Sequence, residues 1–177
     1  MYHKDEVKYM KSLTAYFSYV GQTEMDRKIV DIDKGLTEIV AEKIAQYSGS
    51  DLYKIEPVTP YPKNYNDIVN IVRKENDENP KIEIKNLLPS IDEYEVIYIG
   101  FPIWYRTYPR IVASFLSSYD FSGKTVRPFC TNDEGSFGIA LLEMKSQLKG
   151  ADVKPGLAIH GSEVNDSDDR IKAWLTQ

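Results

Sequence analysis

The sequence contains one cysteine, Cys130, among its 177 residues. A single thiol can form neither a disulfide within the chain nor a zinc site held by several cysteines. Long apolar runs are also missing: the longest, from Val96 to Tyr105, is too short to cross a bilayer and contains a proline. The first residues, Met1 to Glu6, lack the pattern of a secretory leader. From these absences we expect a cytoplasmic protein without a membrane segment.

Positive charge is scarce, with 22 lysines and arginines against 27 aspartates and glutamates and a net charge of −5. A nucleic-acid-binding surface needs a basic stripe, so this class of function is disfavoured. An acidic surface instead suits a basic protein partner that docks by electrostatic steering. The sequence has neither a GxGxxG nor a GxxxxGK[ST] motif, which argues against a Rossmann dinucleotide site and a P-loop. The acidic residues near Asp168 lack EF-hand spacing, and we expect no metal ligands.

The sequence does contain a regular alternation of strand and helix patterns. Continuous β-branched and aromatic runs predict strands, and apolar residues at helical spacing predict helices. Strands are predicted at residues 12–18, 51–55, 96–100, 125–130 and 153–159. Helices are predicted at residues 37–47, 66–76, from Pro109 onward, at 138–148 and at 168–175.

This alternation predicts an α/β fold: a doubly wound, five-stranded parallel sheet with helices on both faces. We expect a single domain over residues 1–177, with residues 1–11 as an N-terminal extension. For the strand order 2-1-3-4-5, the ligand crevice opens at the carboxyl ends of strands one and three, with strand four alongside. The candidate binding loops therefore follow Ser18, Gly100 and Cys130.

Two of these loops are rich in glycine and hydroxyl groups. After the first strand, Ser18, Gly35 and Thr37 offer hydroxyls and backbone amides at a helix start, which suits a phosphate. After the fourth strand, the loop that ends at Gly138 can present backbone groups to the edge of a heteroaromatic ring. Taken alone, the first loop is better explained as a plain turn with a helix cap, and the other is a weak signal because glycine-rich turns between strand and helix are common.

The third strand ends in two large aromatic residues, Trp104 and Tyr105. Such a pair forms either part of the core or a wall for a flat ligand. The preceding proline and the position at a strand end favour the wall. Cys130 ends an apolar strand and is interpreted as a buried, inert thiol, and His160 as a structural or surface histidine.

Together these segments resemble the flavodoxin family, and in particular its branch of short flavodoxin-like proteins. The matching segments are Tyr16-Phe17-Ser18-Tyr19-Val20-Gly21, Pro102-Ile103-Trp104-Tyr105 and Phe129 to Gly138. The resemblance covers roughly residues 13–161 and implies noncovalent binding of FMN. It places Ser18, Val20, Gly21, Gly35, Leu36 and Thr37 around the phosphate, Pro102, Ile103, Trp104 and Tyr105 along the isoalloxazine ring, and Thr131, Gly135, Ser136, Phe137 and Gly138 at its far edge.

The chain departs from the family pattern in its phosphate loop. Val20 stands where threonine is usual, and Leu36 where asparagine is common. An insert from Thr23 to Lys34 splits the loop, so that either Thr23 or Thr37 could supply the hydroxyl for the phosphate. We favour Thr37, because a strand end and the following helix start lie close together whatever loop joins them.

A second departure adds charge, because Asp133 and Glu134 stand where the family often has smaller residues. Carboxylates close to the ring would disfavour a negatively charged reduced flavin and lower the potential of its last reduction step.

The leading interpretation is an FMN-binding electron-transfer flavoprotein, in which the flavin supplies the redox chemistry and no acid–base catalytic residue is required. One alternative is an FMN-dependent NAD(P)H:quinone-type oxidoreductase, although no dedicated pyridine-nucleotide motif occurs. Another is a non-redox regulatory domain on the same fold, although the third strand lacks a phospho-acceptor aspartate at its end. An electron carrier is favoured over a substrate-specific enzyme. We expect a reductase and an acceptor protein as partners, and a monomer or homodimer.

Overall fold

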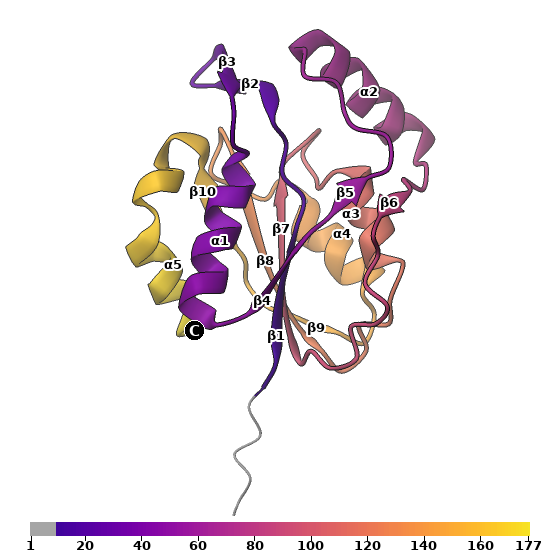
Figure 1. Ribbon diagram of the computed structural model, residues 1–177, viewed down its shortest axis with the longest axis vertical. Coiled ribbons are helices and arrows are strands. Elements are labelled where there is room, and N and C mark those ends of the chain that lie inside the picture. Colours follow the sequence, from indigo (N-terminus) through magenta and orange to yellow (C-terminus); the bar gives the residue numbers. More distant parts are fainter. Residues whose placement is uncertain (1–9) are drawn as a thin grey trace, which may run out of the picture.

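The computed structural model describes residues 10–177, so the expected N-terminal extension lies outside the described residues up to residue 9. A parallel sheet forms the centre of the molecule (Figure 1). Its main strands are β1 (Ser12–Tyr16), β4 (Asp51–Lys54), β7 (Val96–Pro102), β8 (Thr125–Asn132) and β10 (Leu157–His160). They lie in the order β4-β1-β7-β8-β10, and every neighbouring pair is parallel. The predicted doubly wound fold and its order 2-1-3-4-5 are confirmed.

The fifth strand is divided, where the sequence predicts one strand over residues 153–159. The short strand β9 (Asp152–Val153) pairs with the start of β8, and β10 pairs with its end. Pro155 lies between the two pieces and has no N–H to donate to a strand ladder. Both pieces therefore occupy the same edge of the sheet with a break between them.

Helices cover both faces of the sheet (Figure 1). One face carries α1 (Leu36–Ser48) and α5 (Asp168–Leu175), the latter preceded by a 3-10 turn (Gly161–Asp166). The other face carries α3 (Arg110–Leu116) and α4 (Ala140–Gln147), while α2 (Tyr65–Glu78) lies toward the carboxyl ends of the strands. The predicted helices agree with these to within a few residues at each end.

The core consists of two apolar clusters, one on each face of the sheet. Alternate residues of β1 point to opposite faces, as the period of a strand requires. Leu13 and Ala15 pack in the cluster that contains Phe115 of α3, whereas Tyr16 packs in the cluster that contains Trp174 of α5. The strands β7 and β8 are buried on both faces, which explains why they read as continuous apolar runs.

The insert after the first strand forms an antiparallel hairpin of β2 (Gly21–Met25) and β3 (Lys28–Ile32), which the sequence analysis did not predict. The hairpin stands beside α2 at the carboxyl end of the sheet (Figure 1). Its turn residues, Asp26 and Arg27, both have positive φ angles, of 51° and 63°. Two further short strands, β5 (Glu56–Pro57) and β6 (Ile84–Lys85), pair with each other.

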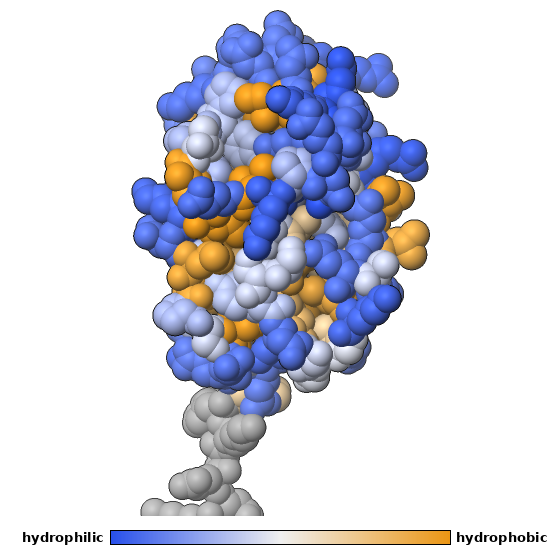
Figure 2. Space-filling model, turned by 90° about the vertical axis from the view of Figure 1, so that its right-hand side faces the viewer, coloured by the Kyte–Doolittle hydropathy of each residue, from blue (hydrophilic) through white to orange (hydrophobic). Residues whose placement is uncertain are grey.

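The surface is largely hydrophilic, with hydrophobic side chains showing through in the middle of the face in Figure 2. Among residues 10–177, no helix combines the length and the apolar character needed to span a membrane.

Candidate functional site

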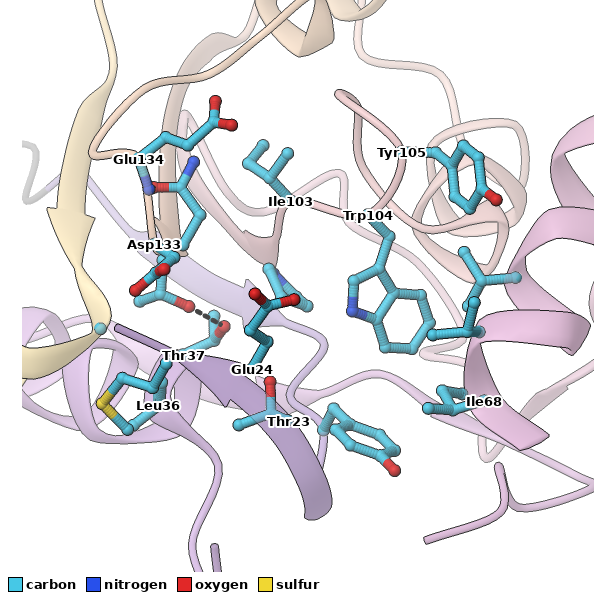
Figure 3. A pocket seen from close by; sticks show the side chains of 18 of the residues that line it. Thr23, Glu24, Leu36, Thr37, Ile68, Ile103, Trp104, Tyr105, Asp133 and Glu134 are labelled. Atoms are coloured by element: carbon cyan, nitrogen blue, oxygen red, sulfur yellow. Dashed lines mark hydrogen bonds between the residues drawn. The ribbon is translucent and has the colours of Figure 1, made fainter. Parts of the chain in front are cut away.

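A cavity of about 710 Å³ lies at the carboxyl ends of the central strands. Its walls come from the segments that follow β1, β7 and β8, and from the hairpin and α2. In Figure 3, Leu36, Thr37 and Asp133 lie on one side, and Trp104, Tyr105 and Ile68 on the other. This is the crevice that the strand order predicts, and its volume is in the range of cofactor pockets.

One end of the cavity lies at the start of α1. The helix N-cap, Gly35, makes no side-chain capping bond, and a Cβ built there would lie 1.9 Å from Ser18 Oγ. Ser18 Oγ instead accepts a hydrogen bond from the backbone N–H of Glu38 at 3.0 Å. The end of β1 and the start of α1 therefore meet despite the insert, and only glycine fits between them. The N–H groups of Leu36 and Thr37 belong to the first turn, where no intrahelical carbonyl is available to them.

Two buried threonines form a hydroxyl pair beside this helix start. Thr37 Oγ1 lies 2.8 Å from Thr131 Oγ1, and both residues line the cavity. One hydroxyl donates to the other, so the accepting hydroxyl keeps its own proton for a further acceptor. The pair can thus donate one hydrogen bond to a ligand.

The segment after β7 supplies an aromatic wall. Pro102, Ile103, Trp104 and Tyr105 all line the cavity. The Trp104 ring also packs edge-on against three other rings, those of Phe17, Tyr19 and Tyr61, at centroid distances of 5.3, 5.7 and 5.3 Å. Trp104 therefore has features of both a core residue and a ligand wall, because it belongs to an aromatic cluster and also faces the cavity.

A tight turn follows Trp104. The backbones of Trp104 and Thr107 exchange hydrogen bonds at 2.8 and 3.2 Å, and the two residues between them, Tyr105 and Arg106, have φ angles of 49° and 68°. Both non-glycine residues thus occupy the sparsely populated left-handed region, which concentrates at functional sites. The Tyr105 hydroxyl accepts a hydrogen bond from Arg73 Nε of α2 at 2.9 Å.

The loop after β8 is shaped by Asn132 and Gly138. Asn132 Oδ1 accepts hydrogen bonds from the N–H groups of Glu134 and Gly135, at 3.2 and 2.6 Å. Gly138 has a φ angle of 54°, and a Cβ there would lie 2.2 Å from the Arg106 carbonyl oxygen. A side chain at Gly138 would therefore push the loop away from the turn after β7.

The hairpin forms a wall that the sequence analysis missed. The residues of the hairpin that line the cavity are Gln22, Thr23, Glu24, Met25 and Ile32. The hairpin is held on the α2 side, where the Gln22 N–H donates to the Lys63 carbonyl at 2.8 Å and the Tyr65 hydroxyl donates to Glu24 Oε2 at 2.9 Å. A signal was present in the sequence, since three of the residues at 28–32 are β-branched, a composition typical of strands.

Helix α2 supplies a further wall, through Tyr65, Ile68, Val69 and Val72. In the sequence, the apolar residues of this segment predict only a helix. Hydrophobic periodicity identifies the buried face of a helix but not whether that face covers a core or a cavity.

Nine of the fifteen predicted site residues line the cavity: Leu36, Thr37, Pro102, Ile103, Trp104, Tyr105, Thr131, Ser136 and Gly138. The other six, Ser18, Val20, Gly21, Gly35, Gly135 and Phe137, do not. Phe137 packs instead against Phe101 in the core, with ring centroids 6.2 Å apart. Gly21 begins β2, and Val20 precedes it. The proposed contacts of all fifteen residues with a ligand stay predictions.

The charges around the cavity are mostly negative. Glu24, Asp133 and Glu134 line it, and Arg106 is the one lysine or arginine among its described lining residues. Cys130 is buried in β8, where burial raises the pKa of its thiol, which agrees with an inert role. The site therefore combines neutral hydrogen-bond donors at a helix start with an aromatic wall and an acidic rim.

Comparison with known proteins places this architecture in a family. The family described as flavodoxin matches residues 11–177. A candidate flavoprotein from Bacteroides uniformis is 29% identical, with a TM-score of 0.75, and the match covers 95% of this chain and 99% of that one. A candidate flavoprotein from Bacteroides eggerthii is also 29% identical, with a TM-score of 0.68 and coverage of 91% and 97%.

A third similar structure is a flavoprotein from Lactobacillus acidophilus in complex with FMN. It is 21% identical, with a TM-score of 0.63, and the match covers 89% of this chain and 98% of that one. No match was found among curated proteins.

Proposed function

The chain belongs to the flavodoxin family, and from this premise we propose that it is an FMN-binding electron-transfer flavoprotein. The observation that carries the proposal is the cavity itself, which joins the start of α1 to the Trp104 wall at the carboxyl ends of β1, β7 and β8. The FMN complex of the Lactobacillus acidophilus relative supports the choice of cofactor.

The residues present fit such a group. An anionic phosphate suits the start of α1, where the amides of Leu36 and Thr37 add to the positive end of the helix dipole. The hydroxyl pair of Thr37 and Thr131 supplies a further donor. A flat ring suits the apolar surface of Ile103 and Trp104.

The bound flavin would supply electron acceptance and donation, and the protein would set its potential and its access to partners. Asp133, Glu134 and Glu24 place carboxylates around the cavity, so they disfavour the added negative charge that reduction brings. We therefore propose a low potential for the final electron and a basic redox partner that docks on the acidic rim by electrostatic steering.

A second function is favoured by the shape of the cavity. Beyond Trp104 the cavity continues along the apolar residues of α2, with Ile68, Val69 and Val72 as its lining. This compartment could hold a small apolar acceptor next to the ring, as an NAD(P)H:quinone-type oxidoreductase requires. The carrier remains our first proposal, because no pyridine-nucleotide motif is found in the sequence.

Absorbance and fluorescence of the purified protein test cofactor binding. We expect flavin bands, or saturable quenching of FMN fluorescence when the cofactor-free protein is titrated. Riboflavin, which lacks the phosphate, should bind more weakly. The absence of saturable FMN binding would refute the proposal.

Stopped-flow mixing of the FMN-loaded protein with NADH or NADPH separates the two functions. Flavin bleaching within seconds, without an added reductase, would favour the oxidoreductase. Bleaching that requires a separate reductase would favour the carrier.

A further inference from the structure

Three metal-binding side chains meet at the rim of the molecule where the hairpin approaches the end of the sheet. They come from three separate segments: Asp26 from the hairpin turn, Asp133 from the loop after β8, and His160 from the last position of β10. One ligand atom from each lies within 4.8 Å of the other two. His160 Nε2 is 3.4 Å from Asp133 Oδ1 and 3.9 Å from Asp26 Oδ1.

These distances suit a metal ion. Zinc bonds to nitrogen and oxygen are about 2.0–2.2 Å long, so two ligands of a tetrahedral site lie about 3.3–3.6 Å apart. The His160–Asp133 distance falls in this range. The distance between His160 Nε2 and Asp26 Oδ1 is a few tenths of an ångström too long for this geometry. Because the Asp26 side chain is 67% exposed, it is free to rotate and bring its carboxylate closer.

The charge of the group also favours a cation. Asp26 and Asp133 lie side by side, and the Asp26 backbone N–H donates to Asp133 Oδ1 at 2.8 Å. Within residues 10–177, neither carboxylate forms an ion pair with a lysine or arginine, and His160 is the one basic side chain within ion-pair distance of them. The Asp133 oxygen that accepts this N–H keeps a second lone pair for a ligand bond.

The other ring nitrogen of His160 has a partner that suits metal binding. Nδ1 lies 2.8 Å from Ser162 Oγ and, as the cap of the 3-10 turn, accepts a hydrogen bond from the Ser162 N–H at 3.3 Å. A histidine that binds a metal through Nε2 usually donates its Nδ1–H to an oxygen, which fixes the ring orientation. A metal on Nε2 would move the ring proton to Nδ1, which would then donate to the Ser162 hydroxyl in place of accepting from the Ser162 N–H.

We propose that Asp26, Asp133 and His160 bind one divalent transition-metal ion, with Zn²⁺ as the best match and a solvent molecule as fourth ligand. One imidazole and two carboxylates suit zinc and its neighbours in the first transition row, whereas Mg²⁺ and Ca²⁺ prefer a full set of oxygen ligands. The ion would join the hairpin turn to the ends of β8 and β10. The proposal does not depend on FMN binding, although Asp133 also lines the cavity.

Calorimetric titration of the full-length, tag-free protein with ZnCl₂ tests the site, with MgCl₂ as the comparison. We expect one saturable zinc site per chain and no comparable Mg²⁺ binding. His160→Ala and Asp26→Asn should each weaken zinc binding by at least about 100-fold, since each removes one of three protein ligands. Asp26→Asn is compatible with the turn, because asparagine tolerates positive φ angles.

Asp31→Asn is the matched control, since it removes the same charge from the same hairpin but lies outside the cluster. It should leave the zinc affinity unchanged. A visible spectrum with Co²⁺ in the cofactor-free protein should show the intense d–d bands of a four- or five-coordinate site, and His160→Ala should abolish them.

The proposal is overturned if zinc does not saturate one site, if His160→Ala binds zinc as well as the unchanged protein does, or if Asp31→Asn weakens binding equally. In the first case the three residues form only a hydrogen-bonded contact between the hairpin and the sheet. FMN titration of His160→Ala separates the two proposals, because His160 does not line the cavity and its loss should leave FMN affinity within about twofold.

Discussion

Replacing Trp104 with alanine should weaken FMN binding and also reduce the stability of the cofactor-free protein. The indole makes three edge-on ring contacts, and each such pair contributes about 0.5–1.5 kcal/mol beyond burial of area. Deleting a fully buried tryptophan costs about 3–5 kcal/mol, and Trp104 is only partly buried. We therefore expect the free energy of unfolding to fall by about 2–3 kcal/mol.

The effect on FMN comes from the side of the ring that faces the cavity. Losing one aromatic contact of this kind should cost about 1.4 kcal/mol or more, which is a tenfold or larger loss of affinity. The chain has one other tryptophan, Trp174, which is 4% exposed and packs against Tyr98 on the opposite face of the sheet. Trp174→Ala is the matched control, with an expected loss of about 3–5 kcal/mol in stability.

Urea unfolding of the cofactor-free variants gives the stabilities, and quenching of FMN fluorescence gives the affinities. Trp174→Ala should leave FMN affinity within about twofold under conditions where the protein is folded. The reasoning is refuted if Trp104→Ala loses stability but keeps its FMN affinity, because Trp104 would then be a core residue alone.

Three further predictions concern other parts of the molecule. Thr37→Val should lower the affinity for FMN about ten- to a hundredfold, because hydrogen bonds to charged groups contribute about 1.5–3 kcal/mol, and should leave riboflavin binding unchanged. If only Thr23→Val has this effect, the phosphate lies nearer the hairpin. Cys130 should not react with a thiol reagent until the protein unfolds, since burial raises its pKa; labelling in native buffer would contradict this. Glu75 accepts a hydrogen bond from the Tyr61 hydroxyl at 3.0 Å, but burial is the larger effect and raises the pKa of its carboxyl group. The native state therefore keeps a proton on Glu75 at pH values where the unfolded chain releases it. Stability should therefore fall as pH rises above the unfolded value of about 4.3, and Glu75→Gln should remove this part of the pH dependence in urea midpoints measured from pH 4 to pH 7.

The centre of the sheet was predictable because β7 and β8 are buried on both faces. A strand such as β7 reads as an unbroken apolar run, and proline or glycine marks its ends. The break in the fifth strand was signalled by Pro155 and Gly156 but was read as a continuous strand. The position of the binding crevice followed from strand order, which depends on topology and needs no side-chain detail.

The walls of the cavity were harder to predict than its position. Irregular loops do not follow a fixed period, so the sequence could not tell that Ser136 faces the cavity while Phe137 turns into the core. The hairpin was missed because its turn, Asp26-Arg27, lacks the glycine or asparagine that usually marks a two-residue turn. The contribution of α2 was missed because the same apolar residues serve a core or a cavity equally well.

The pairing within the hairpin has a consequence for the entropy of the connection between β1 and α1. Gly21 is paired with Ile32, so the inserted chain returns to the point from which it departs. The flexible part of the connection between β1 and α1 is then little longer than it would be without the insert. Even doubling the length of a flexible loop raises the entropic cost of closing it by only about 0.6 kcal/mol. Lengthening or exchanging the hairpin beyond this pair would reshape one side of the cavity while leaving the meeting of Ser18 with the start of α1 undisturbed. We therefore expect the hairpin to tolerate changes in length and sequence, while the contact between β1 and α1 is preserved.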